Sequence, residues 1–259
     1  MPVSRPLVHL PVREADAADR EIARRVASLV ENGVVLQLGI GLLPDAVLAI
    51  LRGHSNLGIH SGVIGDGVVD LVERGVITNA TKPVDTGITV NGGLFGSERL
   101  YRYAHQNPQL RVDPVTYTHS PEVLRHFDSF VTINSAVEVD LTGQVNGEVS
   151  AAGYLCTVGG QTDFARAALL SPRGRSIIAL PSQTGSRMIA RIVSRLAGGV
   201  VSAARADTDI VVTENGFAHL RGQPLRERVQ RMIAIAHPDD QEALEREAAR
   251  IPGLRSFNA

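Results

Sequence analysis

The stretch VVLQLGIGLLPDAVLAIL, residues 34–51, decides the fold that this sequence predicts. Its first five residues, 34–38, form a short apolar run with the length of a buried strand, and this run ends in a turn that contains Gly39 and Gly41. Pro44 then opens an apolar helix, because proline is well placed in the first turn of a helix. The stretch therefore predicts a strand, a glycine turn and a helix in succession.

Helical and strand-like segments alternate on both sides of this stretch. A helical pattern begins at Ala15, and Asn32-Gly33 supplies its stop signal. Further apolar strands are expected at LGIH (57–60), GITV (87–90), FVTIN (130–134), SIIALP (176–181), GGVVS (198–202) and DIVVT (209–213). This alternation predicts an α/β fold with an open, mainly parallel sheet and helices on both faces. In such sheets ligands bind beyond the carboxyl ends of the strands.

The chain is expected to form one large domain after a short N-terminal arm. Residues 1–14 contain three prolines and no periodicity, which is typical of an extended arm or a linker, and the domain is expected to span 15–259. The segment 91–158 is rich in Gly, Pro, Asn and Thr, so we expect a hairpin or extended loops there.

Composition limits the classes of partner. The 26 basic and 27 acidic side chains nearly cancel, so no global field favours nucleic acid or an anionic membrane. The sequence has no apolar run long enough to cross a membrane and no signal-peptide pattern at the N-terminus. A single cysteine, Cys156, fits a reducing compartment, and we expect a cytoplasmic protein. The histidines are scattered without metal-ligand spacing, so we expect no metal site.

Five stretches could carry chemistry, although each alone could also be an ordinary turn. Three are glycine-containing strand ends, whose free N–H groups suit anions or a developing oxyanion, and two are polar segments further along the chain. They are QLGIGLLPDAV (37–47), LGIHSGVIGDGVVDLVERG (57–75), VNGGLFGSERLY (90–101), INSAVEVDLTGQVNGE (133–148) and CTVGGQTDF (156–164). A lone His60 is more often a hydrogen-bonded structural residue than a catalyst, and Ser61 lacks the setting of a serine nucleophile.

Taken together and in order, these stretches carry a resemblance that none of them carries alone. The ordered motifs are LQLGIG-x-x-PDAVL, LGIHS, DGVVDL, GS-x-RLY, INSA-x-EVDLTGQVN, VGGQ-x-DF, SIIALPS, VVTE-x-G-x-A-x-LRG, LRER and IAHP. From about Ala15 onward the chain resembles the C-terminal domain of the acetyl-CoA hydrolase/transferase family, which includes acetate and 4-hydroxybutyrate CoA-transferases. The resemblance implies the CoA-transferase fold, and an N-terminal domain of similar architecture that completes the cleft in full-length relatives.

The resemblance also implies a catalytic position that this sequence has changed. The family exchanges coenzyme A through a glutamate in the motif GIHSE, which forms an acyl anhydride and then a glutamyl-CoA thioester. Gly62 stands at the matching position here, so this covalent route is closed at that residue. Asp66, Asp85 and Glu98 lie nearby in the sequence, but a displaced nucleophile loses orders of magnitude in rate.

Other parts of the implied site are present. The resemblance places Gly92, Gly93, Gly96, Gly159, Gly160 and Gln161 around the coenzyme A thioester, and we also expect the glycine turn at Gly39 and Gly41 to bind coenzyme A. Roles for Asp163, Asn134 and Glu138 follow less directly, and structural roles account for the last two equally well. Glu214 stands in a Glu-Asn-Gly setting that another CoA-transferase branch uses for catalysis, but here we favour a structural role for it.

Three hypotheses about function remain open. The first is an enzyme that processes acyl-CoA, with a small carboxylate as acceptor or with a water in the room left by Gly62, oriented by His60 or Asp66. The second is a non-catalytic acyl-CoA-binding subunit, and the third is a simple substitution in an ordinary transferase. The substrate would be coenzyme A or acyl-CoA, with no permanently bound cofactor. We expect a homo-oligomer or a partner chain that supplies the missing N-terminal half.

Overall fold

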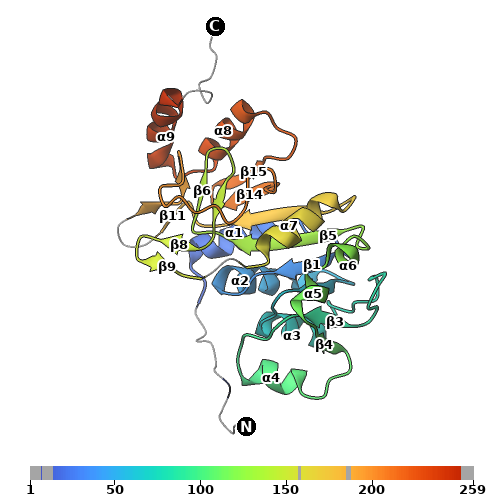
Figure 1. Cartoon of the computed structure of the whole chain (residues 1–259). Helices are drawn as coiled ribbons and strands as arrows, with labels where there is room; N and C mark the ends of the chain where they lie inside the picture. Colours follow the sequence, from blue (N-terminus) through green and yellow to red (C-terminus); the bar gives the residue numbers. More distant parts are fainter. Residues whose placement is uncertain (1–6, 8–13, 157–158, 185–187, 252–259) are drawn as a thin grey trace.

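An eight-stranded sheet forms the centre of the computed structural model, which describes residue 7 and residues 14–156, 159–184 and 188–251 (Figure 1). The strand order is β15-β14-β10-β5-β1-β2-β3-β4, and every neighbouring pair is parallel except β14 and β15. The strands are β1 (Val35–Leu38), β2 (Gly58–Ser61), β3 (Thr89–Asn91), β4 (Leu110–Val112), β5 (Phe130–Ser135), β10 (Arg175–Ala179), β14 (Ile210–Thr213) and β15 (Gly216–His219). The predicted open, mainly parallel α/β sheet is confirmed.

Helices cover both faces of this sheet, as predicted. Alternate residues of a strand point to opposite faces, so Leu36 and Ile133 join one core cluster while Val35 and Phe130 join another. The first cluster lies under α1, α2 and α3, and the second lies under α6 and α7. The helices of these two layers are α1 (Ala17–Ala27), α2 (Leu42–Ile50), α3 (Asp66–Glu73), α6 (Pro121–Leu124) and α7 (Gln161–Leu170).

Local sequence explains where the first helix begins. Asp16 and Asp19 form a capping box, because the side chain of each accepts a hydrogen bond from the backbone N–H of the other. The buried face of the helix carries Ile22 and Val26 at helical spacing. A 3-10 turn, η1 (Leu51–Gly53), extends the helix that follows β1, and two further short helices are α4 (Glu98–Ala104) and α5 (Val115–Thr118).

A smaller layer packs beside the β14–β15 end of the sheet (Figure 1). Its core joins Ile178 and Val211 of the sheet to Met232 and Leu244 of two helices. The elements are α8 (Leu225–Ala234), α9 (Pro238–Arg250) and the short strands β6 (Glu138–Asp140), β7 (Val145–Asn146), β8 (Val149–Ser150), β9 (Gly153–Tyr154), β11 (Gln183–Thr184), β12 (Ile189–Ala190) and β13 (Ile192–Val193). The hairpin expected within 91–158 is present twice, as β6–β7 and β8–β9.

One predicted strand is wrong, and two strands of the eight-stranded sheet were not predicted. Residues 198–202 form a turn and irregular chain, because Gly199 takes a left-handed φ of +69° and the adjacent Ala203 makes only an isolated bridge. The unpredicted strands are the edge strands β4 and β15. Their edge positions leave them only partly buried, so they lack the continuous apolar run that marks a central strand.

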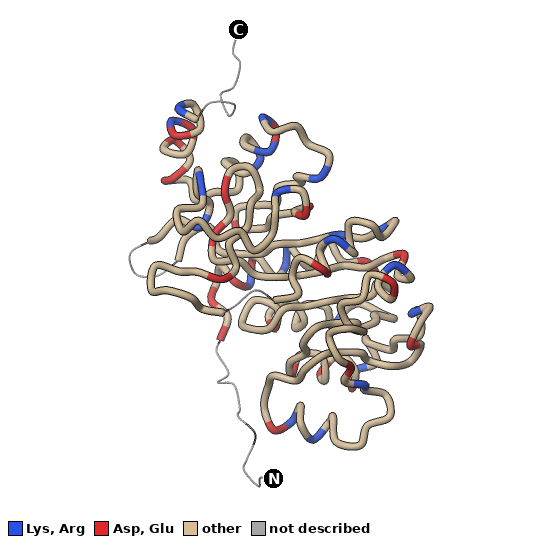
Figure 2. The backbone as a smooth tube through the Cα atoms, viewed as in Figure 1, with Lys and Arg blue, Asp and Glu red and all other residues tan. Residues whose placement is uncertain are grey.

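Charges of both signs are interspersed over the helices and loops (Figure 2). No helix within the described residues is long and apolar enough to cross a membrane. The predicted N-terminal arm, 1–14, lies outside the described residues except for positions 7 and 14.

Candidate active site

The carboxyl ends of β1, β2 and β3 lie next to one another, because these parallel strands are neighbours in the sheet. Each is followed at once by a glycine, namely Gly39, Gly62 and Gly92. The Gly92 N–H donates to the carbonyl oxygens of Ser61 and Gly62 at 3.2 and 3.1 Å. A Cβ atom at Gly92 would lie 2.8 Å from the Gly62 carbonyl oxygen, so this glycine lets two strand ends approach closely.

A cavity of about 530 Å³ opens at this edge of the sheet. Its volume falls in the range of small-molecule sites. The predicted residues Gly39, Gly41, Asp66 and Gly96 line it, together with Asp45. The structure thus brings the turn after β1 and the loops around α3 and α4 to one cavity.

Two carboxylates of this cavity have different surroundings. Burial raises the pKa of Asp45, and the charge of Asp66 raises it further. The carboxylate of Asp66 accepts hydrogen bonds from the backbone N–H and the hydroxyl of Ser97, both at 2.7 Å. A Cβ atom at Gly96 would lie 2.6 Å from Asp66 Oδ2, so the glycine makes room for this carboxylate. Asp66 therefore fastens the start of α4 and also lines the cavity.

Gly62 lies beside two rings that come from elsewhere in the chain. A Cβ atom at Gly62 would lie 3.2 Å from Cε1 and Nε2 of His119 and 3.2 Å from Cε2 of Phe164. The two rings pack on each other, with centroids 4.4 Å apart and planes tilted by 43°. Val63, the residue after Gly62, lines the cavity. Gly62 is therefore adjacent to the cavity and closed on one side by an imidazole.

The glycine pair before α7 reaches the same imidazole. A Cβ atom at Gly160 would lie 2.0 Å from Nε2 of His119, whereas one at Gly159 would meet nothing within 4 Å. Gln161 follows as the first residue of α7, and its side-chain nitrogen is buried without a hydrogen-bond partner among the described residues. Gly93 has only Phe95 near its Cβ position, at 3.9 Å. Coenzyme A binding by these residues stays a prediction.

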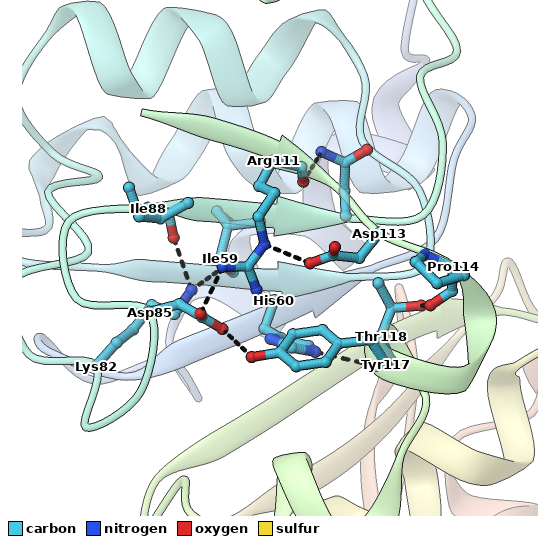
Figure 3. A network of polar contacts seen from close by, with 11 residues as sticks. Ile59, His60, Lys82, Asp85, Ile88, Arg111, Asp113, Pro114, Tyr117 and Thr118 are labelled. Carbon is cyan, nitrogen blue, oxygen red and sulfur yellow. Dashed lines mark hydrogen bonds and ion pairs between the residues drawn. The ribbon is translucent and has the colours of Figure 1, made fainter. Parts of the chain in front are cut away.

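His60 is wholly buried and belongs to the polar network shown in Figure 3. Its Nε2 atom lies 3.0 Å from the carbonyl oxygen of Thr118, and its Nδ1 atom is buried without a partner among the described residues. Burial, and then the nearby charge of Lys82, lowers the pKa of His60 to about 4. The imidazole is therefore neutral at pH 7 and shielded from solvent. Its proposed role in orienting a water stays a prediction, and His60 is not among the residues that line the cavity.

Lys82 and Asp85 belong to the same buried network (Figure 3). The ammonium of Lys82 donates to the carbonyl oxygens of Ile59 and Ile88 at 2.9 and 2.7 Å, and burial lowers its pKa to about 8. Asp85 accepts from the Tyr117 hydroxyl at 2.8 Å and pairs with Arg111 at 2.9 Å. Burial opposes ionisation of Asp85, but the hydrogen bonds from Tyr117 and Arg111 outweigh it and lower the pKa of this carboxyl.

The other acidic candidates also have partners. Glu98 forms an exposed ion pair with Arg102. Glu138 accepts from the amide of Asn146 at 3.1 Å. The carboxylate of Glu214 accepts from both the N–H and the hydroxyl of Ser182, at the far side of β10 from Gly62. These contacts fit structural roles for the three carboxylates.

The remaining two polar candidates differ in burial. Asn134 and Gln37 exchange side-chain hydrogen bonds of 2.9 and 3.1 Å between β5 and β1, which fits a structural role. Asp163 is exposed on the first turn of α7. Its functional role stays a prediction.

His119 and Phe164 are the neighbours of Gly62 that the sequence did not indicate. His119 follows α5, which begins at Val115, and it stands 57 positions after Gly62. No glycine turn or strand end marks it, so the only available signal was its residue type. Among the described residues no group of histidine, cysteine and carboxylate side chains could hold a metal ion.

The fold and the cavity together are typical of α/β domains, in which ligands bind at the carboxyl edge of a parallel sheet. Comparison with protein families then identifies the family. Residues 96–248, more than half of the chain, match the model of the acetyl-CoA hydrolase/transferase C-terminal domain. The chain belongs to this family, and the resemblance drawn from its ordered motifs is confirmed.

Known relatives agree with this assignment. The chain is 44% identical over 245 residues to a 4-hydroxybutyrate coenzyme A transferase of Clostridium kluyveri. The aligned region covers 94% of the chain and 57% of the relative. The chain is 32% identical over 248 residues to an acetyl-CoA hydrolase of Kluyveromyces lactis, covering 90% of the chain and 46% of the relative. The crystal structure of RipA from Yersinia pestis matches with a TM-score of 0.90 and 39% identity, over 95% of this chain and 56% of that one. The chain thus spans about half the length of these relatives.

Proposed function

We propose that this chain processes short-chain acyl-CoA thioesters at the carboxyl ends of β1, β2 and β3, and that it does so by hydrolysis. The observation that carries the proposal is Gly62, which stands at the end of β2 beside the cavity and offers no carboxylate. Family membership supports a CoA thioester as the substrate class, because relatives are named as CoA-transferases and acetyl-CoA hydrolases. Transfer through a glutamyl-CoA thioester needs a nucleophile that Gly62 cannot supply.

In the proposed reaction a water takes the place of the nucleophile. Its oxygen attacks the thioester carbonyl carbon, the carbon–sulfur bond breaks, and the products are the carboxylate, a proton and free coenzyme A. The backbone N–H groups of the glycine turns would stabilise the oxyanion that develops on the carbonyl oxygen. Asp66 lines the cavity, so it remains a candidate for orienting the water.

A second candidate function is acyl-CoA binding without turnover, as one half of a larger assembly. The observation that favours it is length, because the chain covers 57% of the Clostridium kluyveri relative and 56% of RipA. A homo-oligomer, or a partner chain with the remaining half, would then complete the cleft. The acceptor in a transfer reaction would be a small carboxylate, and the proposed location is the cytoplasm.

The test compares the chain with its Gly62→Glu and Gly62→Gln variants. Thioester loss from acetyl-CoA is followed with and without a carboxylate acceptor, and coenzyme A binding is measured by calorimetry. We expect slow, acceptor-independent hydrolysis by the parent chain, with no covalent CoA adduct on the protein. We expect acceptor-dependent transfer only in the glutamate variant, because glutamine has the same size without the nucleophile.

The outcomes separate the two candidate functions. Binding without turnover in the parent chain would favour the role as a non-catalytic subunit. Trapping a covalent CoA adduct on the parent chain would contradict hydrolysis by water. Lack of coenzyme A binding by the chain would contradict both candidates.

A further inference from the structure

The side chain that closes the site at Gly62 is an imidazole in a defined position. Nε2 of His119 faces the Cβ positions of both Gly62 and Gly160, at 3.2 and 2.0 Å. Phe164 packs against the same ring and fixes its plane. The ring therefore lies where the end of β2 meets the start of α7, next to the place that the resemblance assigns to the reacting thioester.

A hydrogen bond on the other side of the ring is compatible with a free lone pair at Nε2. Nδ1 of His119 lies 2.8 Å from the hydroxyl oxygen of Thr118, which itself lies 3.5 Å from the Pro114 carbonyl oxygen. In the tautomer in which Nδ1–H donates to Thr118, the Thr118 hydroxyl faces Pro114 and Nε2 carries the lone pair. Nε2 has no hydrogen-bond partner among the described residues, and it keeps some exposure to solvent.

The surroundings also keep this imidazole neutral. Burial lowers the pKa of His119, and the negative charge of Asp163 acts in the opposite direction without outweighing it. A neutral imidazole with an unprotonated Nε2 atom is the form that a general base requires.

We propose that His119 is the general base of the thioester hydrolysis, acting from the site beside Gly62. Nε2 takes one proton from water while the water oxygen bonds to the thioester carbonyl carbon. The tetrahedral intermediate then loses the coenzyme A thiolate, which takes the proton from the imidazolium, and the new carboxylic acid releases its own proton to solvent. This inference rests on the proposed function and names the residue that activates the water.

The geometry favours His119 over the two residues that the sequence suggested for this task. His60 is fully buried, and its Nε2 atom is already held by a carbonyl oxygen. Both carboxylate oxygens of Asp66 accept hydrogen bonds from Ser97. His119, in contrast, presents an unpartnered basic atom 3.2 Å from the Cβ position of Gly62.

The first test measures hydrolysis of acetyl-CoA by the chain, by His119→Gln and by the control His126→Gln, which changes an exposed histidine outside the site. General base catalysis contributes about 100-fold or more, so we expect kcat of His119→Gln to fall by about 100-fold with KM within about twofold. Added imidazole should restore part of the rate. The acidic limb of the kcat profile, which reports the protonation of His119, should disappear in the variant.

The second test uses the unaltered chain and does not depend on a variant that folds. Diethyl pyrocarbonate carbethoxylates neutral imidazoles, and trypsin separates the two histidines, because His119 lies alone in peptide 112–125 and His126 lies in the following peptide. We expect saturating acetyl-CoA to slow the modification of His119 by about tenfold or more. A bound ligand shields the residues of its site, and the protection grows with the ratio of ligand concentration to Kd. Modification of His126 should be unchanged.

The outcomes distinguish this inference from the function on which it rests. If coenzyme A binds and hydrolysis proceeds at the same rate in His119→Gln, His119 is not the base, whereas the proposed function stands. Equal modification of His119 with and without acetyl-CoA would also overturn the inference. Absence of coenzyme A binding or of hydrolysis in the unaltered chain would remove the hydrolytic function, and the inference with it.

Discussion

Adding a single methyl group at Gly160 tests the packing on which the site depends. In Gly160→Ala the new Cβ atom would lie 2.0 Å from Nε2 of His119, where ordinary contact begins at 3.4 Å, so the ring must move by about 1.4 Å. The backbone itself accepts alanine, because Gly160 has φ −79° and ψ 4°. The strain therefore falls on the ring and its partners, the Thr118 hydroxyl and Phe164.

The expected cost follows from the contacts that the moving ring gives up. A hydrogen bond contributes about 1 kcal/mol, and an aromatic pair about 0.5–1.5 kcal/mol. Gly160→Ala should therefore lower the free energy of unfolding by about 1.5–2.5 kcal/mol relative to Gly159→Ala. Gly159 is the matched control because its Cβ position is open, and both changes restrict the unfolded chain equally.

Urea denaturation of the two alanine variants measures this difference directly. A displacement of about 1 Å in a reacting group can lower a rate about 100-fold, so acetyl-CoA hydrolysis should also fall in Gly160→Ala and not in Gly159→Ala. Equal stability and equal rates in the two variants would refute the placement of His119 against Gly160.

Two further predictions concern the strand ends and the buried network. Gly92→Ala should lower the free energy of unfolding by about 1–3 kcal/mol in urea denaturation, because its Cβ atom would lie 2.8 Å from a backbone oxygen that cannot move away. The control Gly93→Ala has only a ring edge near its Cβ position, at 3.9 Å, so it should change the free energy of unfolding by less than about 0.5 kcal/mol. Lys82 is the single lysine of the sequence, and its pKa is about 8 in the folded chain against 10.5 in the unfolded chain. The cost of burying its charge is therefore fully present below pH 8 and disappears as the pH rises toward 10.5. Stability relative to Lys82→Met should therefore rise by about 3 kcal/mol over that interval, and a flat difference in urea midpoints across it would contradict the burial of a charged lysine.

The sequence predicts the central sheet well because its strands are continuous apolar runs. Residues 34–38 and 130–133 are buried on both faces, so every side chain in them lies in the core and the pattern is clear. The run 198–202 also contains adjacent valines, but its two glycines and a left-handed turn prevent pairing, and Val201 is exposed. A short apolar run alone therefore predicts neither a strand nor burial.

The candidate site was only partly predictable for a related reason. The glycine turns after β1, β2 and β3 could be placed at one edge because parallel neighbours end together. His119 reaches the same edge from a loop, and its position depends on tertiary packing against Phe164 of α7. Sequence spacing carries no information about such a contact, so the sequence did not indicate His119. His60, which lies in the motif, is fully buried.

Gly62, His119 and Gly160 are coupled sterically, and this coupling affects what a glutamate introduced at position 62 can do. A side chain at Gly62 begins 3.2 Å from the His119 ring, which is too close for an ordinary contact, so the imidazole must shift before a glutamate can enter. Because Gly160 has no Cβ atom, it leaves room for the His119 ring in its present position. Such coupled positions are not additive, so the effect of Gly62→Glu should depend on the residue at position 119. A glutamate that restores transfer only when His119 is also replaced by a smaller residue would show that the imidazole now occupies the working space of the nucleophile.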